Sequence, residues 1–248
     1  MSFIVVENVG KVYGASAGGP RTRVLEGVSF RIAEGQFVAL MGPSGSGKTT
    51  LLTVVGAMNR PTEGSVVVDG IDVYALSEER RADFRREYLG FVFQQHHLMP
   101  YLSAVENVML PLATVRTSSR EKKESATKAL EKVGLASKAQ RLPNELSGGE
   151  QGRLAIARAV VNEPPLLLAD EPTGALDTRT GEEVMSVLLD LNARGQTVLL
   201  VTHNHETAAH AGRVLHLRDG RRSGETARLF TRTETVKGYN PALVAEEL

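Results

Sequence analysis

The sequence predicts an α/β fold with a mainly parallel central sheet, an N-terminal antiparallel β region and an inserted helical subdomain. Short apolar runs alternate with helical patterns along most of the chain, and this alternation is typical of layered α/β architectures. One apolar run, at 36–41, leads into a glycine-rich loop and then a helix that begins near Lys48. Between about 95 and 161 the pattern becomes helical, which indicates the inserted segment.

The apolar runs predict the strands in chain order. We expect strands near 3–6, 24–32, 36–41, 65–69, 89–93, 165–169, 197–201 and 213–217. The first of these, at the N-terminus, is predicted as an edge strand. Helices are expected after Lys48, over the charged and periodic stretch 120–133, and over 152–161, before Pro164. The charged stretch 78–87 is predicted as a solvated helix face.

The same patterns divide the chain into parts. We predict one domain over 1–228, with an α/β core at about 1–94 and 162–228 and the helical subdomain at about 95–161. The segment 14–20 is a flexible loop by composition, and 229–248 forms a C-terminal tail.

The composition excludes several classes of protein. The 248 residues are 42% hydrophobic and 23% charged, which is enough for a sizeable core. Basic and acidic residues number 29 each, so no overall field favours nucleic acid or an anionic membrane surface. Cysteine is absent, which excludes disulfides and thiolate chemistry. No run reaches the roughly 18 apolar residues of a membrane helix, and no secretory signal is recognisable, so we expect a cytoplasmic location.

A glycine-rich segment follows the strand predicted at 36–41. It matches G-x-x-x-x-G-K-[ST] and consists of Gly42, Pro43, Ser44, Gly45, Ser46, Gly47, Lys48 and Thr49. Glycines allow successive backbone amides to turn towards one anion, and Lys48 brings a positive charge to the β and γ phosphates of a nucleotide. The strand–loop–helix context therefore predicts a phosphate site.

Two acids end the buried run at 166–169. An isolated Asp-Glu pair at a strand end is more often a solvated turn, but the phosphate loop favours a functional interpretation of Asp170 and Glu171. We expect Asp170 to hold Mg²⁺ through a water while Thr49 ligates the ion directly, because this cation prefers oxygen ligands. We expect Glu171 to polarise the attacking water.

A second candidate phosphate site lies at Ser147, Gly148 and Gly149, where a helix is expected to begin. A hydroxyl, bare amides and the helix dipole favour an anion there. The alternative interpretation is an ordinary serine N-cap followed by glycines. Two phosphate sites exceed what one chain needs for one nucleotide.

These motifs, together with three others, resemble the ATP-binding subunit of an ABC transporter over roughly residues 3–224. The segments, in the order of that family, are 42–49, Phe93-Gln94-Gln95, Leu146-Ser147-Gly148-Gly149-Glu150, Leu168-Ala169-Asp170-Glu171-Pro172-Thr173, Ala175-Leu176-Asp177 and Val201-Thr202-His203. The resemblance implies a P-loop ATPase that uses ATP and Mg²⁺.

The resemblance also implies roles for individual residues. Tyr13 would stack on adenine, Gln94 would reach Mg²⁺ and the attacking water, and His203 would contact the γ-phosphate. The implied catalytic residues are Glu171, His203, Gln94 and Lys48, and the implied metal-binding residues are Thr49, Gln94 and Asp170. The implied nucleotide contacts are Tyr13, the loop from Gly42 through Thr49, Thr50, Ser147, Gly148, Gly149, Glu150 and Asp177.

The family arrangement implies a second copy of the chain as a partner. In a head-to-tail dimer with two-fold symmetry, Ser147 of one subunit completes the site that Lys48 of the other builds, and two ATP molecules are held. Asp177 would couple the two sites. ATP would close the dimer, and hydrolysis would weaken the closure.

Within the family, the segments 89–100, 105–108 and 110–112 resemble the branch of lipoprotein-releasing and macrolide-export ATPases. Its members pair with a separate integral membrane permease, so we expect membrane contact only through a permease at the inner face of the cell membrane. The apolar segment 98–112 is predicted to form part of a groove for a short cytoplasmic helix of the permease. The alternative is a regulatory or soluble ABC ATPase, of the division-complex type, that moves no substrate directly.

Two positions and the C-terminal tail at 229–248 depart from the family pattern. Gly152 stands where relatives commonly have Gln, and Asn204 replaces a frequent acid after His203. Glycine weakens a helix, so Gly152 indicates close packing.

Overall fold

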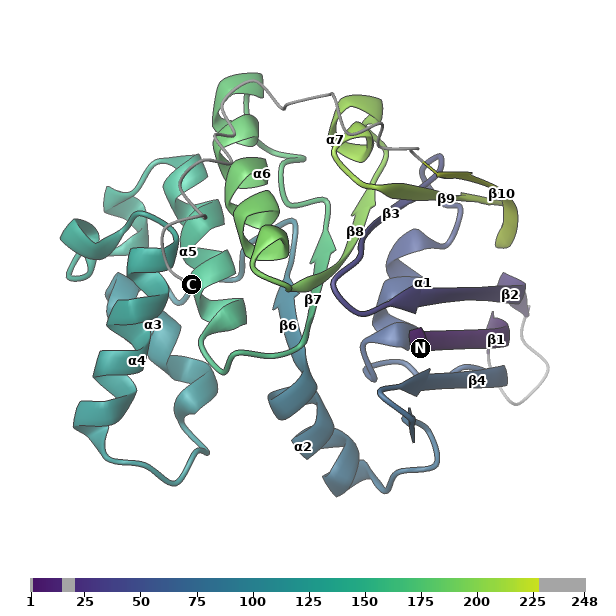
Figure 1. Ribbon diagram of the computed structural model, residues 1–248, viewed down its shortest axis with the longest axis horizontal. Helices are drawn as coiled ribbons and strands as arrows, with labels where there is room; N and C mark the ends of the chain where they lie inside the picture. Colours follow the sequence, from purple (N-terminus) through teal and green to yellow (C-terminus); the bar gives the residue numbers. More distant parts are fainter. Residues whose placement is uncertain (1, 15–20, 228–248) are drawn as a thin grey trace, which may run out of the picture.

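The computed structural model describes residues 2–14 and 21–227, which form two sheets with helices between and beside them (Figure 1). The strands are β1 (Ser2–Tyr13), β2 (Thr22–Ala33), β3 (Phe37–Met41), β4 (Glu63–Val68), β5 (Ile71–Asp72), β6 (Leu89–Val92), β7 (Leu166–Asp170), β8 (Thr197–Thr202), β9 (Arg213–Arg218) and β10 (Arg221–Ala227). The helices are α1 (Lys48–Val55), α2 (Glu78–Tyr88), α3 (Ala104–Met109), α4 (Ser119–Lys132), α5 (Gly148–Val160), α6 (Thr178–Ala193) and α7 (His205–Ala209). The expected tail at 229–248, and nearly all of the expected loop at 14–20, lie outside the described residues.

The larger sheet confirms the predicted parallel core. Its order is β10-β9-β3-β8-β7-β6, and every pairing in it is parallel except that of β9 with β10. All residues of β3 and β8 are buried, because helices cover both faces of the sheet. Parallel strands all end at the same edge, so β3, β6, β7 and β8 bring their carboxyl ends together there.

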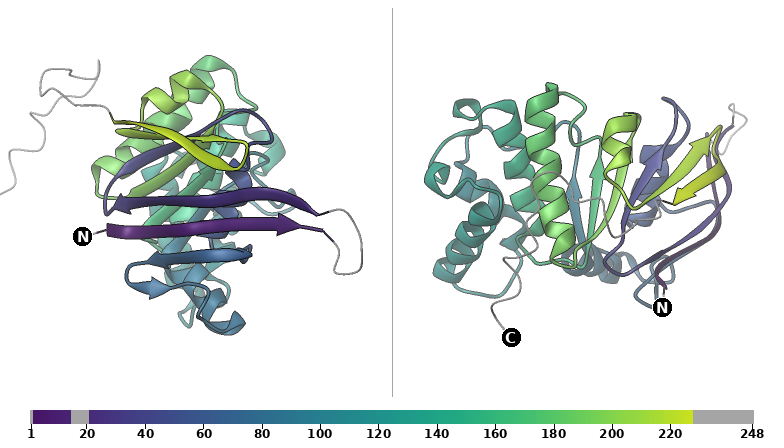
Figure 2. Two further views of the ribbon diagram at one scale, coloured as in Figure 1. Left: turned by 90° about the vertical axis from the view of Figure 1, so that its right-hand side faces the viewer. Right: turned by 45° about the horizontal axis from the view of Figure 1, so that its top comes forward.

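The smaller sheet is antiparallel, with the order β2-β1-β4-β5, and its face is seen in Figure 2 (left). The predicted antiparallel β region is thus confirmed, but the prediction of an edge strand at the N-terminus is wrong. Ile4 pairs with Ile32 on one side and with Val68 on the other. The edge prediction failed because the N-terminal residues do not show which later strands will pair with them.

Two strands that the apolar pattern missed each follow an Asp-Gly pair. Asp69 and Gly70 connect β4 to β5, while Asp219 and Gly220 connect β9 to β10, and all four residues have positive φ. Asp-Gly at the tip of a hairpin is a strong sequence signal because both central residues of a type I′ turn need that conformation. The sequence therefore contained the signal for these strands.

Helix α1 lies between the two sheets, and this packing fixes the loop that precedes it. Leu51 and Leu52 of α1 belong to one buried cluster with Ile4 of β1, Leu40 of β3 and Val66 of β4. Burial of several aliphatic side chains, each worth about 1.5–3 kcal/mol, holds the helix against both sheets. The start of α1 is therefore rigidly placed.

The helices α3, α4 and α5 lie together beside the parallel sheet (Figures 1 and 2). They share a second buried cluster with that sheet, in which Leu130 and Ile156 join Leu167 and Leu200. The helical character predicted between about 95 and 161 is confirmed, since these helices and short 3₁₀ turns are the elements there. Its treatment as a separate subdomain stays a prediction.

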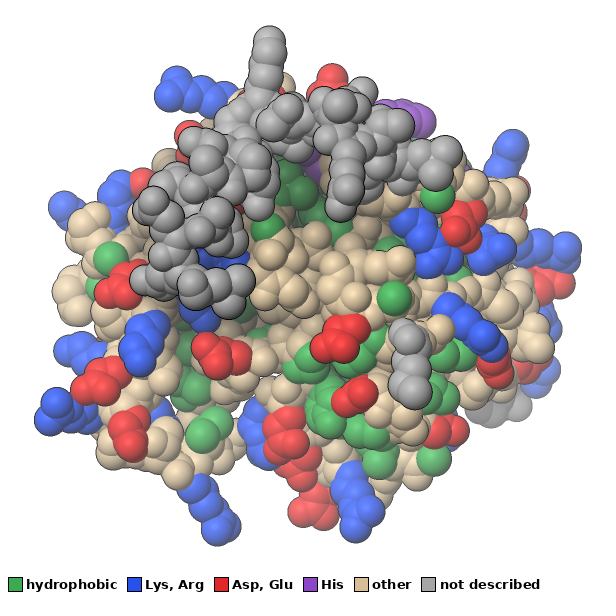
Figure 3. Space-filling model, in the orientation of Figure 1, with side chains coloured by type: hydrophobic (Ala, Val, Ile, Leu, Met, Phe, Trp, Pro, Cys, Tyr) green, Lys and Arg blue, Asp and Glu red, His purple; other side chains and the backbone are tan. Residues whose placement is uncertain are grey.

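Basic and acidic side chains are interspersed over the face shown in Figure 3, in agreement with the balanced composition. The predicted solvated helix is α2, whose only buried residue is Phe84. Within residues 2–14 and 21–227, none of the helices has the length and apolar character needed to cross a lipid bilayer.

Candidate functional site

The glycine-rich loop connects β3 to α1 in a conformation that requires glycine. Gly45 and Gly47 have φ values of 79° and 98°. A Cβ on Gly42 would lie 2.1 Å from the carbonyl oxygen of Leu217, so a larger residue there would displace backbone. Gly47 is the N-cap of α1, and among the described residues no side chain caps this helix. The first amides of α1 are therefore left for an anion.

Lys48 is held inside the curve of this loop. The side chain is 6% exposed, and its Nζ donates hydrogen bonds to the carbonyl oxygens of Gly42, at 2.8 Å, and Pro43, at 2.9 Å. These bonds span the loop and fix the position of the positive charge. The hydroxyl of Ser46 is also buried, and it has no hydrogen-bond partner among the residues that the structure describes. Both groups suit a polyanion bound in the loop.

Asp170, at the end of β7, reaches the start of α1. Its Oδ1 accepts a hydrogen bond from the hydroxyl of Thr49 at 3.2 Å. Burial raises the pKa of Asp170 above its ordinary value, an effect that the Thr49 hydrogen bond partly offsets. A nearby cation would stabilise the charged form of this carboxyl group. The hydroxyl oxygen of Thr49 and the carboxylate oxygens of Asp170 are ligands of the kind that Mg²⁺ prefers.

Glu171 forms a pair with His203 at the ends of β7 and β8. Its Oε1 lies 2.8 Å from His203 Nδ1, and the side chain of Glu171 is only 17% exposed. Glu171 has a φ of 45°, and its N–H donates to the carbonyl oxygen of Val201 at 2.9 Å. A non-glycine residue in this conformation is strained, which is typical of functional positions.

Gln94 lies beside Glu171, and a glycine makes this approach possible. A Cβ on Gly174 would lie 3.2 Å from both Gln94 Nε2 and Glu171 Oε2. The fold thus brings together Gln94, Glu171 and His203, in agreement with the roles that the family resemblance implies for them. Sequence reasoning missed Gly174, although it stands within four residues of Asp170.

Ser147 caps α5 in the way that the alternative interpretation of this motif predicts. Its hydroxyl accepts from the N–H of Glu150 at 3.3 Å, and the carboxylate of Glu150 accepts from the N–H of Ser147 at 2.9 Å. Lys138 also donates to Glu150, and these bonds hold the pKa of that carboxyl below its ordinary value, with the Lys138 bond as the largest cause. Ser147 is nonetheless exposed, so its O–H can still reach a ligand.

Asp177 caps α6 beside this capped end of α5. Its carboxylate accepts from the N–H of Thr180 at 3.0 Å and from the Thr180 hydroxyl at 2.6 Å, and these bonds lower the pKa of Asp177. A Cβ on Gly149 would lie 2.1 Å from Thr180 Cγ2, so the two helix ends are in contact. Within the described part of the chain, no hydrogen bond or ion pair joins Ser147 or Asp177 to the phosphate loop.

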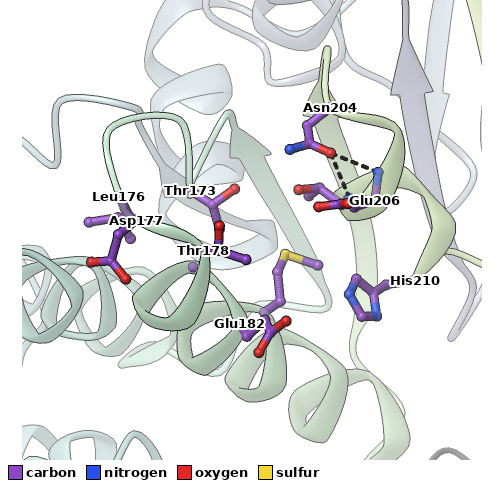
Figure 4. A pocket seen from close by; sticks show the side chains of 11 residues that line it. Thr173, Leu176, Asp177, Thr178, Glu182, Asn204, Glu206 and His210 are labelled. Carbon is purple, nitrogen blue, oxygen red and sulfur yellow. Dashed lines mark hydrogen bonds between the residues drawn. The ribbon is translucent and has the colours of Figure 1, made fainter.

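A small hollow of 130 Å³ separates α6 from α7 next to Asp177 (Figure 4). Asn204 lies on the α7 side of this hollow, where its side chain accepts from the N–H groups of Glu206 and Thr207. Asn204 therefore performs the capping task that an acid could also perform. The departure from the family pattern at this position leaves the start of α7 intact.

Gly152 confirms the close packing that its place in a helix indicated. A Cβ there would lie 3.1 Å from Val184 Cγ2 of α6 and 3.6 Å from His96 Cε1. A longer side chain would displace both neighbours.

Tyr13 is 43% exposed at the end of β1. Asn59 donates a hydrogen bond to its hydroxyl, and Lys11 Nζ lies 5.0 Å from the centre of its ring. The paired strand β2 contacts the phosphate loop, since a Cβ on Gly47 would lie 2.8 Å from Leu25 Cδ2. The ring is therefore presented from the sheet that borders the loop.

A glycine loop between a parallel strand and a helix, with acids at the tip of another strand of the same sheet, defines a P-loop nucleotide hydrolase. The chain belongs to the ABC transporter family, because the family model "ABC transporter" matches residues 25–174. ATP hydrolysis is the general activity of this family, so the protein is an ABC-type ATPase.

Relatives and solved structures agree with this assignment. The chain is 47% identical over 218 residues to an uncharacterized ABC transporter ATP-binding protein, YknY, of Bacillus subtilis (strain 168), covering 88% of this chain and 94% of that one. It is 45% identical over 202 residues to the macrolide export ATP-binding/permease protein MacB of Burkholderia pseudomallei, covering 82% of this chain and 31% of MacB. A dimeric post-hydrolysis structure of the ATP-binding cassette MJ0796, bound to ADP and Pi, matches with a TM-score of 0.81 and 42% identity over 90% of this chain and 98% of that one.

Proposed function

We propose that this protein is the ATP-hydrolysing subunit of an ABC transporter, which dimerises head to tail on ATP and drives a separate membrane permease for export, release or mechanotransmission. The observation that carries the proposal is the constellation of Glu171, His203 and Gln94 beside the phosphate loop. Two named relatives support the wider assembly, because MJ0796 is described as dimeric and MacB as an export ATP-binding/permease protein.

In this proposal the loop binds the triphosphate. The amides at the start of α1 and the ammonium of Lys48 contact the phosphates, while Tyr13 stacks on the base. Thr49 and Asp170, with Gln94, would hold Mg²⁺, which when bound neutralises phosphate charge. The half-buried carboxyl group of Asp170 is then stabilised in its charged form.

The three residues beside the loop act on the attacking water. Glu171 accepts its hydrogen bond and draws its proton, and the amide of Gln94 fixes its direction. Nδ1 of His203 lies at the Glu171 carboxylate, and Nε2 donates to a phosphate oxygen. Both bonds together need the imidazolium form, because the neutral ring has a single N–H. The strained backbone of Glu171 holds its carboxylate in this position.

The catalytic assignment is tested with Glu171→Gln. The amide keeps the size of the side chain but loses the proton acceptor, so we expect kcat to fall at least about 100-fold while ATP still binds. The variant should accumulate as a dimer with ATP, measured by light scattering after size exclusion. Glu34→Gln, an exposed change outside the site, is the matched control. Undiminished turnover in Glu171→Gln would refute the assignment.

A hollow of 610 Å³ supports the proposal of a permease partner. Its lining combines apolar residues with charged residues of α2 and with Arg158 of α5; the apolar ones include Met58, Phe91, Phe93 and Pro111. A hollow of this shape suits a short amphipathic helix. Of the segment 98–112, which was expected to form the groove, only Pro111 lines it.

The rest of that segment divides between core and surface. Val105, Val108 and Leu112 are buried, whereas Met99 is 46% exposed and Tyr101 is 91% exposed. The structure therefore offers two surfaces for the permease, of which the hollow is the more enclosed.

The partner is tested by trapping the Glu171→Gln protein with ATP in its own detergent-solubilised membranes and identifying co-purifying proteins. We expect a permease with an extracytoplasmic domain. Met58→Asp should abolish this capture and Tyr101→Asp should preserve it, with ATP binding unchanged in both. The opposite result would place docking on the surface of Met99 and Tyr101. Recovery of only soluble partners would favour the regulatory ATPase of the division-complex type.

A further inference from the structure

The turn that follows Gln94 has an unusual backbone. His96 and His97 have φ values of 25° and 47°, and neither is a glycine. The N–H of His97 donates to the carbonyl oxygen of Gln95 across this tight turn. Side chains with a Cβ adopt the left-handed region at a cost, so two such residues in succession persist only if neighbouring groups hold them.

Arg158 of α5 holds both residues of the turn. Its Nη1 donates to the carbonyl oxygen of His97 at 2.6 Å, and its Nη2 donates to that of His96. The planar guanidinium can bridge two neighbouring acceptors in one plane, which an ammonium group cannot do. Arg158 therefore matches the geometry of this turn.

Arg158 also lines the 610 Å³ hollow proposed above for the permease, but its hydrogen bonds go to the turn. The side chain is half-buried, and burial lowers the pKa of its guanidinium. Over residues 2–14 and 21–227, no carboxylate lies within 4.0 Å of it to form an ion pair. A half-buried cation is stable only if its N–H groups have hydrogen-bond acceptors. The acceptors of Arg158 are the carbonyl oxygens of two residues with strained backbone.

Helix α5 contacts the turn at a second point. The ring of His96 lies next to Gly152, where a Cβ would approach its Cε1 to 3.6 Å and its Nε2 to 3.7 Å. A Cβ at Gly152 would be in ordinary van der Waals contact with this ring, and only a longer side chain would displace it. Helix α5 therefore contacts the turn through both Gly152 and Arg158.

We propose that Arg158 is a positioning residue for the hydrolysis reaction, whose guanidinium fixes the turn of His96 and His97 and thereby holds Gln94 beside Glu171. The proposal rests on the function proposed above for Gln94. It also gives α5 a mechanical task, because Ser147 and Arg158 lie at opposite ends of one helix of 13 residues, about 20 Å long.

The test compares the steady-state ATPase activity of full-length variants. Arg158→Ala should lower kcat about tenfold, because a small misplacement of a group beside the reacting atoms has a large effect on rate, while KM for ATP changes less than about twofold. Arg153→Ala, which removes a guanidinium from the same helix without touching the turn, is the matched control and should leave kcat unchanged.

A second variant separates positioning from stability. Glycine adopts positive φ without strain, so adding His97→Gly to Arg158→Ala should restore most of the lost kcat. Rescue of this kind is not expected if Arg158 merely stabilises the fold. An unchanged kcat in Arg158→Ala, or a loss that His97→Gly does not restore, would overturn the proposal.

The function proposed for Gln94 is tested independently by Gln94→Ala. Loss of kcat in Gln94→Ala with full activity in Arg158→Ala would refute only the positioning role of Arg158. Full activity in Gln94→Ala would refute the proposed role of Gln94 itself, and the inference would fall with it.

Discussion

Two helices of this protein, α1 and α5, begin with sequences that predict phosphate binding, but their first turns are built differently. At α1 the N-cap is Gly47, no side chain caps the helix, and the first turn has no acid. At α5 the N-cap is Ser147, which forms a reciprocal capping box with Glu150. The start of α1 is thus open to an anion, whereas at α5 the N–H groups of Ser147 and Glu150 already have partners in the capping box.

This difference indicates unequal tasks for the two helix ends. The amides of α1, with Lys48 buried beside them, can bind phosphate within one chain. The capped end of α5 carries a carboxylate, which opposes an anion, and it is stable without any ligand. Its exposed Ser147 is therefore better suited to add a contact to a nucleotide that another subunit already holds.

The largest expected effect of a substitution is the loss of ATP affinity at the start of α1. Lys48→Ala removes two possible charged hydrogen bonds to phosphate, and at about 1.5 kcal/mol each this weakens ATP binding about 100-fold. Titration with a fluorescent ATP analogue measures the affinity, and circular dichroism checks the fold. Lys132→Ala, on the surface of α4, is the control. Affinity within threefold of the parent protein would contradict an essential role for α1 as the primary phosphate site.

A smaller effect is expected at α5. Ser147→Ala should lower the free energy of unfolding by about 1 kcal/mol through loss of the cap, and leave ATP binding by the monomer unchanged. In the Glu171→Gln background it should also prevent dimerisation with ATP, measured by light scattering.

A matched control exists at α4. Ser118 forms the same capping box with Glu121 there. Ser118→Ala should therefore cost similar stability but preserve the dimer. Equal loss of the dimer in both variants would reduce Ser147 to a structural cap.

The smallest effect is a dependence of stability on pH. Because the pKa of Glu150 is lowered in the folded protein, its contribution to stability is complete above the pKa of the unfolded chain and is lost as pH falls through the folded value. Glu150→Gln should flatten the acid limb of a thermal denaturation series. The first turn of α1 contributes no such limb, since it has no acid. An unchanged acid limb in Glu150→Gln would show that the hydrogen bonds to its carboxylate add nothing.

Much of the site could be predicted from the sequence because its chemistry is local. The loop from Gly42 to Thr49, the acids Asp170 and Glu171, and the helix start at Ser147 are each encoded by adjacent residues. Their conformations follow from glycine, from a strand end and from a capping box. These predictions needed no knowledge of distant segments.

Other features were not predictable in this way. The interior place of β1, the closeness of Gly174 to Gln94, and the fork of Arg158 on two carbonyl groups all depend on segments far apart in the chain. The strands β5 and β10 form an intermediate case, since each follows an Asp-Gly signal that the apolar pattern alone does not reveal.

By itself, the sequence determined the phosphate loop and the strand that ends in two acids, because short motifs have characteristic conformations. The order of the same motifs along the chain also indicated the family. The family resemblance implies that Gln94, Glu171 and His203 share one site, but only the tertiary structure shows how the fold brings them there. They follow β6, β7 and β8, and these parallel strands end at one edge because of their hydrogen-bond register. That register is set by packing between residues distant in sequence, which no local pattern contains.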